Sequence, residues 1–300
     1  MNRSLHGWKE FSCRHLVEDI SQYIGNFISS LTRYLIDTVE HLILACILYI
    51  IVCITLYIFM VKRKYITFNR ETRNAKRVLF VIAHPDDECM FFGPTILTYT
   101  RKKNCQVYLM CLTTGQNYGM GSTRKKELYN SCKILGIPMG NIFIHSHTNL
   151  PDTMDVRWPT ELISHIISYQ VDTLNITTLI TFDRYGVSRH CNHCCIYYGV
   201  ANLILDRKLP KYCGVYVLES INTLRKYWLL LDIPVSLFLS RFRFMHSFED
   251  RKIIHKAMRE HQSQLVWFRR LYMHFSRYML INTLQQMNLV DIELDLVIDD

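Results

Sequence analysis

The longest apolar stretch of the chain lies near its N-terminus. Residues 42–61 read LILACILYIIVCITLYIFMV and contain no charged residue, proline or glycine. A helix of twenty residues rises about 30 Å, the thickness of the hydrocarbon core of a bilayer. A helix of a soluble protein normally keeps a polar face, and this stretch has none. The pattern therefore predicts a single transmembrane helix over residues 42–61.

Beyond residue 76, short apolar runs alternate with segments of helical periodicity. This alternation predicts an α/β domain with a mostly parallel sheet covered by helices on both faces. Such sheets bind ligands at the carboxyl ends of their strands. The runs predict strands at 78–83, 106–112, 142–144, 178–182 and 214–218, and helices near 91–102, 123–135, 159–170 and 191–207.

Three further segments have less regular patterns, and the first two are open to more than one interpretation. Residues 1–41 carry apolar side chains near helical spacing, which fits either an amphipathic interfacial helix or a weakly ordered tail. Residues 228–239 are apolar but too short to span a bilayer, and fit either a segment that dips into the membrane interface or a core helix or loop. Residues 291–300 alternate at first, which predicts an edge strand followed by a solvated tail.

Charge indicates the orientation of the span. Seven Lys or Arg residues lie between 62 and 77 against one acid, whereas residues 1–40 mix four basic with five acidic residues. The positive-inside rule then places the C-terminal part in the cytosol. Eleven cysteines without regular spacing favour reduced thiols, which fits that compartment. The predicted organisation is an N-terminal segment 1–41, the span 42–61, a basic linker 62–76 and a catalytic domain 77–300.

The formal net charge of +9 favours anionic partners without choosing among them. The sequence shows no zinc-finger spacing and no RNA-binding aromatic signature, so no nucleic-acid partner is expected.

A first cluster of reactive side chains, HPDDE at residues 84–88, follows the first predicted strand. His84 and Asp87 are three residues apart on a turn that enters a helix, a spacing that can direct both toward one point. Imidazole nitrogen and carboxylate oxygen suit Zn²⁺. Asp86 lies between them and could then serve as a base. The alternative is a polar turn with a helix cap.

A second cluster, residues 183–193, follows the fourth predicted strand and should emerge at the same sheet edge. His193 could complete a His/Asp/His site with an open position, the arrangement of hydrolytic zinc. His190 could then lie beside that open position. A competing interpretation is a structural zinc site built from neighbouring cysteines, although a second ligand pair at a distance is missing. Those cysteines are Cys191, Cys194 and Cys195.

The two clusters, HPDDE at 84–88 and GVSRHCNH at 186–193, resemble the PIG-L/LmbE-like de-N-acetylase family. The resemblance implies a Rossmann-like fold in which His84, Asp87 and His193 bind Zn²⁺ or another divalent metal. It further implies that Asp86 is the general base and that His190 polarises the amide oxygen. Arg189 stands where a glycine is common in the family. Substrate contacts are expected at Arg124, Asp152, Arg189, His261 and Gln264.

Together with the membrane span, the resemblance points to the family members that act on N-acetylglucosaminyl-phosphatidylinositol in GPI-anchor biosynthesis. It implies zinc-dependent hydrolysis to glucosaminyl-phosphatidylinositol and acetate. The expected partners are this glycolipid and the phospholipid bilayer. The expected location is the endoplasmic reticulum membrane, with a single pass and the catalytic domain facing the cytosol. Two alternatives remain open: a de-N-acetylase of another GlcNAc conjugate, or a catalytically silent membrane scaffold.

Overall fold

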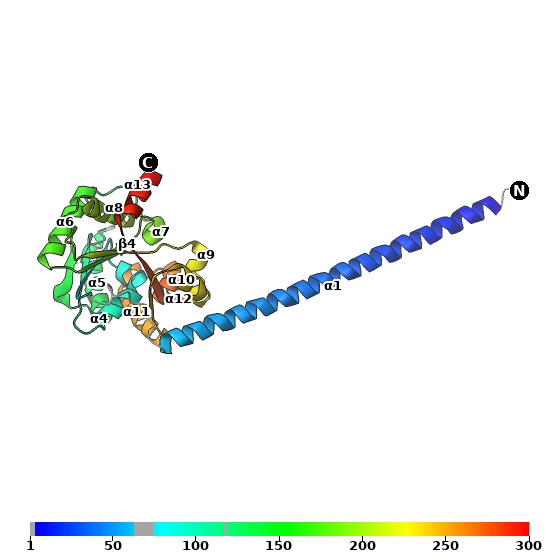
Figure 1. The fold of residues 1–300 in the computed structure, drawn as a ribbon, viewed down its shortest axis with the longest axis horizontal. Helices are drawn as coiled ribbons and strands as arrows, with labels where there is room; N and C mark the ends of the chain where they lie inside the picture. Colours follow the sequence, from blue (N-terminus) through cyan, green and yellow to red (C-terminus); the bar gives the residue numbers. More distant parts are fainter. Residues whose placement is uncertain (1–3, 63–74, 117–118, 300) are drawn as a thin grey trace. The chain divides into compact units, whose positions relative to one another are not determined.

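The computed structural model describes residues 4–62, 75–116 and 119–299 (Figure 1). The chain divides into two compact units, Met1–Ile54 and Thr55–Asp300. Most of the predicted linker 62–76 falls outside the described residues. The first unit consists of helix α1, which begins at Ser4 and extends to Lys62 in the second unit.

Helix α1 contains the predicted span 42–61 and continues without a break toward the N-terminus. From Ser4 onward, residues 1–41 are helical and continuous with the predicted span, rather than a weakly ordered tail. The stretch Val17–Lys62 is long and apolar enough to cross a membrane by length and composition. The described part of the chain therefore has one candidate span, as predicted.

The second unit is built on a seven-stranded sheet of order β3-β2-β1-β4-β5-β7-β6. The first five strands pair in parallel, and β7 runs antiparallel to both β5 and β6. The α/β fold with a mostly parallel sheet is thus confirmed, and β6 and β7 were not predicted. The strands are β1 (Arg77–Ile82), β2 (Gln106–Cys111), β3 (Ile142–Ile144), β4 (Thr178–Phe182), β5 (Gly214–Leu218), β6 (Phe242–Met245) and β7 (Ile281–Gln286).

Helices cover both faces of this sheet. In Figure 1, α6 and α8 lie on one side of β4, and α4, α5 and α11 lie on the other. The α-helices are α3 (Asp87–Met90), α4 (Gly93–Thr100), α5 (Gly121–Leu135), α6 (Thr160–Thr173), α7 (Gly186–Arg189), α8 (Cys191–Leu205), α9 (Thr223–Lys226), α10 (Ile233–Leu239), α11 (Phe248–Glu260), α12 (Trp267–Phe275) and α13 (Leu289–Asp299). The 3₁₀ helices are η2 (Met139–Asn141), η3 (Leu229–Asp232), η4 (Gln262–Gln264) and η5 (Arg277–Met279).

The core is made of strands that are apolar along their whole length. In β1 every residue from Val78 to Ile82 is buried, and all five residues of β4 are buried. Continuous apolar strands are expected where helices cover both faces of a parallel sheet. A second, smaller cluster joins Met60, near the end of α1, to Ile233 of α10 and Met245 of β6. The last turns of α1 therefore pack on the sheet edge formed by β6.

The prediction of an edge strand and a solvated tail over 291–300 is wrong, because α13 occupies Leu289–Asp299. The side chain of Asn288 accepts a hydrogen bond from the backbone N–H of Asp291 at 3.0 Å and caps this helix. Ile292 is buried while Leu294 is exposed, which breaks the two-residue alternation expected of a strand. Asp295 pairs with Arg184 at 3.1 Å and accepts a hydrogen bond from Tyr197 of α8.

Residues 228–239 form η3 and α10 rather than a loop. Ile233 is buried in the second cluster, whereas Phe238 and Leu239 at the end of α10 are exposed. The core-helix interpretation therefore accounts for one side of α10 and leaves two large apolar side chains unexplained.

Candidate metal and catalytic site

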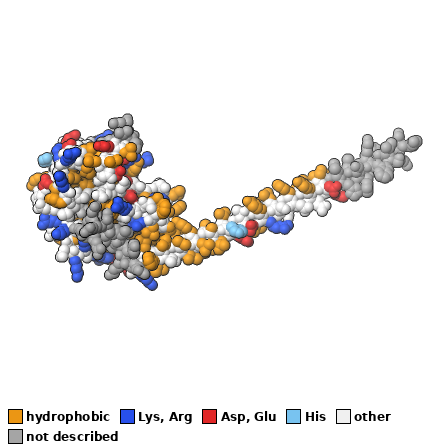
Figure 2. Space-filling view, in the orientation of Figure 1, with side chains coloured by type: hydrophobic (Ala, Val, Ile, Leu, Met, Phe, Trp, Pro, Cys, Tyr) orange, Lys and Arg blue, Asp and Glu red, His pale blue; other side chains and the backbone are white. Residues whose placement is uncertain are grey.

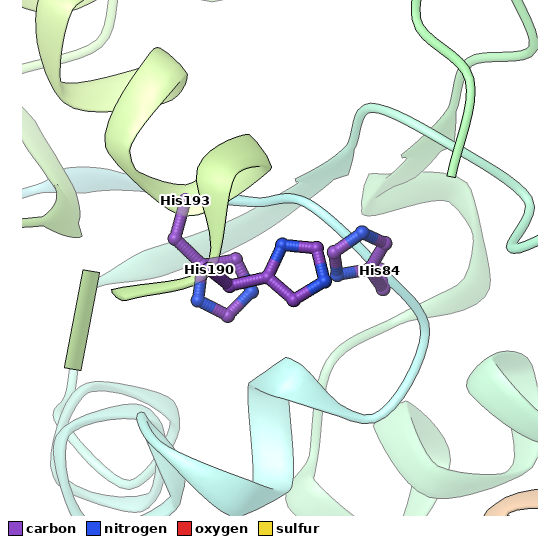
Figure 3. A group of neighbouring side chains, drawn as sticks. All are labelled: His84, His190 and His193. Atoms are coloured by element: carbon purple, nitrogen blue, oxygen red, sulfur yellow. The ribbon is translucent and has the colours of Figure 1, made fainter. Parts of the chain in front are cut away.

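The two sequence clusters meet where β1 and β4 end side by side. Because β1 and β4 are neighbours in a parallel sheet, the loops that leave their carboxyl ends emerge at the same edge. Figure 3 shows the rings of His84, His190 and His193 gathered at this point. The ring centroids of His84 and His190 are 4.6 Å apart, and those of His190 and His193 are 4.9 Å apart. The structure thus brings together the residues that the two motifs supply.

Asp87 lies at the start of α3 with its carboxylate turned back toward the end of β1. Its Oδ2 accepts hydrogen bonds from the backbone N–H groups of Ala83 at 3.1 Å and His84 at 2.9 Å. Its Oδ1 lies 3.3 Å from Nε2 of His193. Burial raises the pKa of the Asp87 carboxyl, but His193 and His84 outweigh burial and lower this pKa well below its usual value. Asp87 is therefore a carboxylate.

His193 is fixed by its other ring nitrogen and by ring stacking. Its Nδ1 lies 3.0 Å from the carbonyl oxygen of Gly186 and donates to it, which leaves Nε2 without a proton. The ring stacks on Phe182 with centroids 4.0 Å apart. A Cβ on Gly186 would lie 2.6 Å from the His193 Cβ, so only glycine fits there. Nε2 of His193 is buried and has no hydrogen-bond partner.

His84 presents its second nitrogen to the same point. Its Nε2 lies 3.1 Å from Oδ1 of Asp152, beside the side-chain amide of Asn192 at 2.9 Å. We assign the ring proton to Nε2, where Asp152 accepts it, and turn the Asn192 amide so that its oxygen rather than Nδ2 faces this nitrogen. Nδ1 is then without a proton and lies 3.7 Å from Oδ2 of Asp87.

With these proton assignments, the unprotonated nitrogens of His84 and His193 face the carboxylate of Asp87. Such a set is stabilised by a cation, and two imidazoles with one carboxylate form a donor set that suits Zn²⁺ or a similar divalent metal. The ligand atoms of His84, His190 and His193 also lie within 4.8 Å of one another. The residues present therefore fit a divalent metal.

Asp86 has an unusual backbone. Its φ of 113° lies in the left-handed region, a strained conformation for a residue with a side chain. Its backbone N–H donates to Oε2 of Glu88 at 3.0 Å, and its Oδ2 lies 2.6 Å from Nη1 of Arg269. Burial raises the pKa of Asp86, and the positive charge of Arg269 offsets part of this increase. The carboxylate lines the same pocket as Asp87 and suits proton transfer.

His190 caps the N-terminus of α8. Its Nδ1 accepts the backbone N–H of Asn192 at 3.3 Å, which assigns the ring proton to Nε2. Burial, together with His84 and His193, lowers the pKa of His190 to about 4. At neutral pH the ring is therefore uncharged and offers a single N–H donor.

A cavity of about 640 Å³ opens beside these groups. Three of the predicted substrate contacts, Arg124, Asp152 and Gln264, line it. Nη1 of Arg124 donates to Oδ2 of Asp152 at 2.9 Å, and Nη2 donates to the carbonyl oxygen of Pro85 at 3.0 Å. Arg124 thus connects the loop after β1 to the aspartate that orients His84.

The other two predicted contacts do not line this cavity. His261 is fully buried, and its Nε2 lies 2.6 Å from Oε1 of Glu88, so it pairs with the residue that supports the backbone of Asp86. Arg189 is exposed at the end of α7, outside the cavity, and adopts φ 58°. This left-handed conformation favours glycine, which explains why glycine is common at this position in the family that the sequence resembles.

The cysteine cluster does not form the alternative structural site. Burial raises the pKa values of Cys194 and Cys195 to about 11, so both remain protonated thiols. Within the described residues, no candidate metal group includes Cys191, Cys194 or Cys195.

Helix α12 contributes side chains that sequence reasoning did not find. Phe268, Arg269 and Tyr272 line the cavity, together with Lys226 and Tyr227 from the end of α9. The amphipathic spacing of 267–275 was visible in the sequence. Nothing in that spacing connects Arg269 to Asp86, because the contact depends on how α12 packs near α3, where Tyr272 donates to the carbonyl oxygen of Met90.

Comparison with known proteins supports the family resemblance. Residues 79–204 match the family described as "PIG-L: GlcNAc-PI de-N-acetylase". The chain is 47% identical over 209 residues to the Bos taurus N-acetylglucosaminyl-phosphatidylinositol de-N-acetylase, covering 69% of this chain and 82% of that protein. It is 39% identical over 227 residues to a probable enzyme of the same description from Schizosaccharomyces pombe, covering 72% and 89%.

A solved structure, N,N'-diacetylchitobiose deacetylase from Pyrococcus horikoshii, shares the fold with a TM-score of 0.53 and 16% identity, covering 74% of this chain and 87% of that one. The predicted fold class and hydrolase class are thereby confirmed. The match over both sequence clusters and the extent of the curated relatives lead to one conclusion: the chain belongs to the PIG-L family of GlcNAc-PI de-N-acetylases.

Proposed function

We propose that the chain is a divalent-metal-dependent de-N-acetylase that hydrolyses the acetamide of N-acetylglucosaminyl-phosphatidylinositol to a free amine and acetate. The observation that carries this proposal is the facing set of acceptor atoms on His84, Asp87 and His193, with the Asp86 carboxylate in the same pocket. The names of the Bos taurus and Schizosaccharomyces pombe relatives support the choice of substrate.

His84, Asp87 and His193 would hold the metal, with Zn²⁺ as the first candidate. A divalent metal in such a site supplies Lewis acidity, which polarises a carbonyl and lowers the pKa of a water to about 7. Asp152 orients His84, and Gly186 orients His193, so each ring presents one defined nitrogen.

Asp86 acts as the general base. Its carboxylate takes a proton from the attacking water while the water oxygen bonds to the acetamide carbonyl carbon. The C–N bond then breaks, and the same proton passes from Asp86 to the leaving nitrogen. The immediate products are the glucosamine amine and acetic acid, which keeps the second water hydrogen. At neutral pH the acid ionises to acetate and the amine takes up that proton, so atoms and charge balance.

His190 acts on the carbonyl oxygen. Because its proton resides on Nε2, the neutral ring donates a hydrogen bond to the oxygen as negative charge develops there. One such donor is worth about 3 kcal/mol of transition-state stabilisation. A neutral donor also avoids placing another positive charge beside a metal.

The membrane location belongs to the same proposal. Helix α1 anchors the chain in the endoplasmic reticulum membrane, with the basic residues after the span holding the catalytic unit on the cytosolic side. The substrate keeps its acyl chains in the bilayer, so a membrane-anchored enzyme meets it at the surface.

The test is acetate release by the full chain, purified in detergent and loaded with zinc, from N-acetylglucosaminyl-phosphatidylinositol. Asp86→Asn should keep the metal, measured by mass spectrometry, and lose at least about 100-fold in turnover. His193→Ala should lose both metal and turnover. Lys208→Ala, on an exposed loop, is the matched control and should change neither.

Other outcomes identify the alternatives. If the metal-loaded protein releases no acetate from this lipid but does so from another GlcNAc conjugate, that conjugate is the substrate. If the protein binds no metal and deacetylates neither compound, the chain is a membrane scaffold rather than an enzyme. Full turnover by Asp86→Asn would refute the proposed base.

A further inference from the structure

Helices α10 and α12 present large apolar side chains to the outside of the catalytic unit. Figure 2 shows hydrophobic side chains gathered over the region where Figure 1 labels α9, α10 and α12. Phe238 is 89% exposed and Trp267 is 72% exposed. We call this surface the apolar rim, and it consists of Phe238, Leu239, Trp267, Phe268, Leu271 and Phe275.

On α12 these side chains occupy one face. At 100° per residue, Trp267, Phe268, Leu271 and Phe275 fall within an arc of about 100°. The opposite side carries Tyr272 and Met273, which are buried against the unit. Helix α12 is therefore amphipathic with its apolar face outward, the reverse of what a water-exposed helix requires.

Contacts join the elements of the rim. The rings of Tyr227 and Tyr272 lie 6.4 Å apart, which connects α9 to α12. Arg277, directly after α12, forms a buried ion pair with Asp232, directly before α10. The start of α10 and the end of α12 are therefore held next to each other inside the unit.

The rim borders both the pocket and the end of α1. Phe268 lines the pocket and is also exposed, so the pocket opens at the rim. Ile233 of α10 packs with Met60 of α1, within the same compact unit. The last turns of a membrane-crossing helix lie near the bilayer surface, and α10 contacts the last turns of α1.

Charge around the rim fits an anionic leaflet. Between Asn222 and Arg243 the sequence contains one acid, Asp232, and this residue is buried in the ion pair with Arg277. No acid occurs between His261 and Val290. Arg241 and Arg270 are exposed and can reach lipid phosphates.

We propose that the apolar rim inserts into the interfacial layer of an anionic phospholipid bilayer and holds the pocket mouth at the headgroup level. This inference rests on the proposed function, since it explains how a sugar on a membrane lipid enters the pocket without extraction of the lipid. The rim is a membrane contact separate from the span, and it orients the catalytic unit rather than anchoring the chain.

Fluorescence tests the insertion directly. The full chain carrying Trp8→Phe is reconstituted in phosphatidylcholine–phosphatidylserine vesicles, beside the same protein with Trp267→Phe added. The difference between the two spectra reports Trp267. Lipids brominated near the headgroup should quench this difference signal, and aqueous iodide should leave it largely unquenched. Quenching by iodide but not by brominated lipid would overturn the proposal.

Activity tests the consequence. Trp267→Ser combined with Leu271→Ser, two rim residues outside the pocket lining, should lower kcat/KM for vesicle-borne substrate on the order of ten-fold. Turnover of a water-soluble analogue that lacks acyl chains should be unchanged. Met139→Ser, equally exposed at 71% near the opposite sheet edge, is the matched control and should affect neither substrate.

The two proposals fail in different ways. If the unaltered chain deacetylates neither the lipid nor the analogue, the proposed function fails. If it deacetylates both, and the rim variant does so equally well, the rim has no role in orienting the pocket and this inference fails alone.

Discussion

Arg269 of α12 lies 2.6 Å from the carboxylate of Asp86, so the helix at the pocket mouth directly contacts the proposed base. The guanidinium opposes the effect of burial and lowers the pKa of Asp86. A base must be deprotonated to act, and its loss on acidification sets the acid limb of the pH–rate profile.

Arg269→Met should therefore move the acid limb of kcat/KM to higher pH. Without this positive charge, burial and the negative charge of Asp87 are opposed only by Arg124 and His261. The pKa of Asp86 therefore increases, and the active carboxylate forms only at higher pH. The neighbouring exposed Arg270→Met is the control and should leave the limb in place. A fall in turnover at every pH with an unmoved limb would indicate that Arg269 contacts substrate only.

His261→Ala should destabilise the protein rather than weaken substrate binding. Both members of the Glu88–His261 pair are fully buried, and loss of one partner from such a pair costs about 3–5 kcal/mol. Thermal unfolding of the full chain in detergent measures this loss. An unchanged melting temperature with an increased KM would instead restore the predicted substrate contact.

The same pair gives a pH window for stability. Burial raises the pKa of Glu88, but His261 outweighs burial, and the net pKa is below the usual 4.5. The ionised Glu88 therefore contributes fully to the free energy of unfolding above pH 4.5, and this contribution is lost as the pH falls through the lowered pKa. Burial lowers the pKa of His261, but Glu88 outweighs burial, and the net pKa is above 6.5. The protonated His261 therefore contributes fully to the free energy of unfolding below pH 6.5, and this contribution is lost as the pH increases through the raised pKa. The difference in stability between the unaltered chain and His261→Ala should be largest between these two pH values.

Arg189→Gly should stabilise the protein by about 1 kcal/mol, because glycine adopts the observed φ of 58° without steric cost. Chemical denaturation of the unit measures the gain. Arg189→Ala removes the charge but keeps the strained backbone, so it should give no comparable gain. Equal stabilisation by both variants would attribute the effect to charge.

Zinc should stabilise the folded chain through His84, Asp87 and His193. At a free concentration 100-fold above Kd, a ligand specific for the folded state adds about 2.7 kcal/mol to the free energy of unfolding. Chelation should remove this gain from the unaltered chain. His193→Ala should show no difference with and without chelator, and a retained difference would place the metal elsewhere.

The sequon at Asn175 tests the orientation of the span. Asn175-Ile176-Thr177 lies in the catalytic unit and should stay unmodified if that unit faces the cytosol. Asn2-Arg3-Ser4 is a sequon on the other side of the span, so Asn2→Gln is the companion variant. A glycosidase-sensitive shift in electrophoretic mobility that disappears in Asn175→Gln would contradict the proposed orientation and place the catalytic unit in the lumen.

The parallel half of the fold could be predicted because its signals are local. Continuous apolar runs such as 78–82 mark buried strands, and the reactive residues follow directly after them. Strand β7, in contrast, reads INTLQQ and buries Asn282, whose side chain donates to the carbonyl oxygen of Phe91 at 2.8 Å. A polar residue that is satisfied by a distant partner leaves no apolar pattern in the sequence.

The contact between Arg269 and Asp86 could not be predicted for the same reason. The two residues are far apart in the chain, and Arg269 belongs to neither sequence cluster. His261 shows the opposite case. The family resemblance implied a substrate contact, whereas the structure buries this side chain and pairs it with Glu88.

The hydrogen bond and ion pair of Asp295 have a practical consequence for anyone who handles the protein. Through Arg184 and Tyr197, the C-terminal helix supports the loop and helix that present His193. A deletion that removes Asp295, or a bulky affinity tag fused close behind it, would disturb the catalytic loop before it disturbed the sheet. Purified protein of that kind could be soluble, correctly folded and inactive, and its inactivity would be mistaken for the wrong substrate.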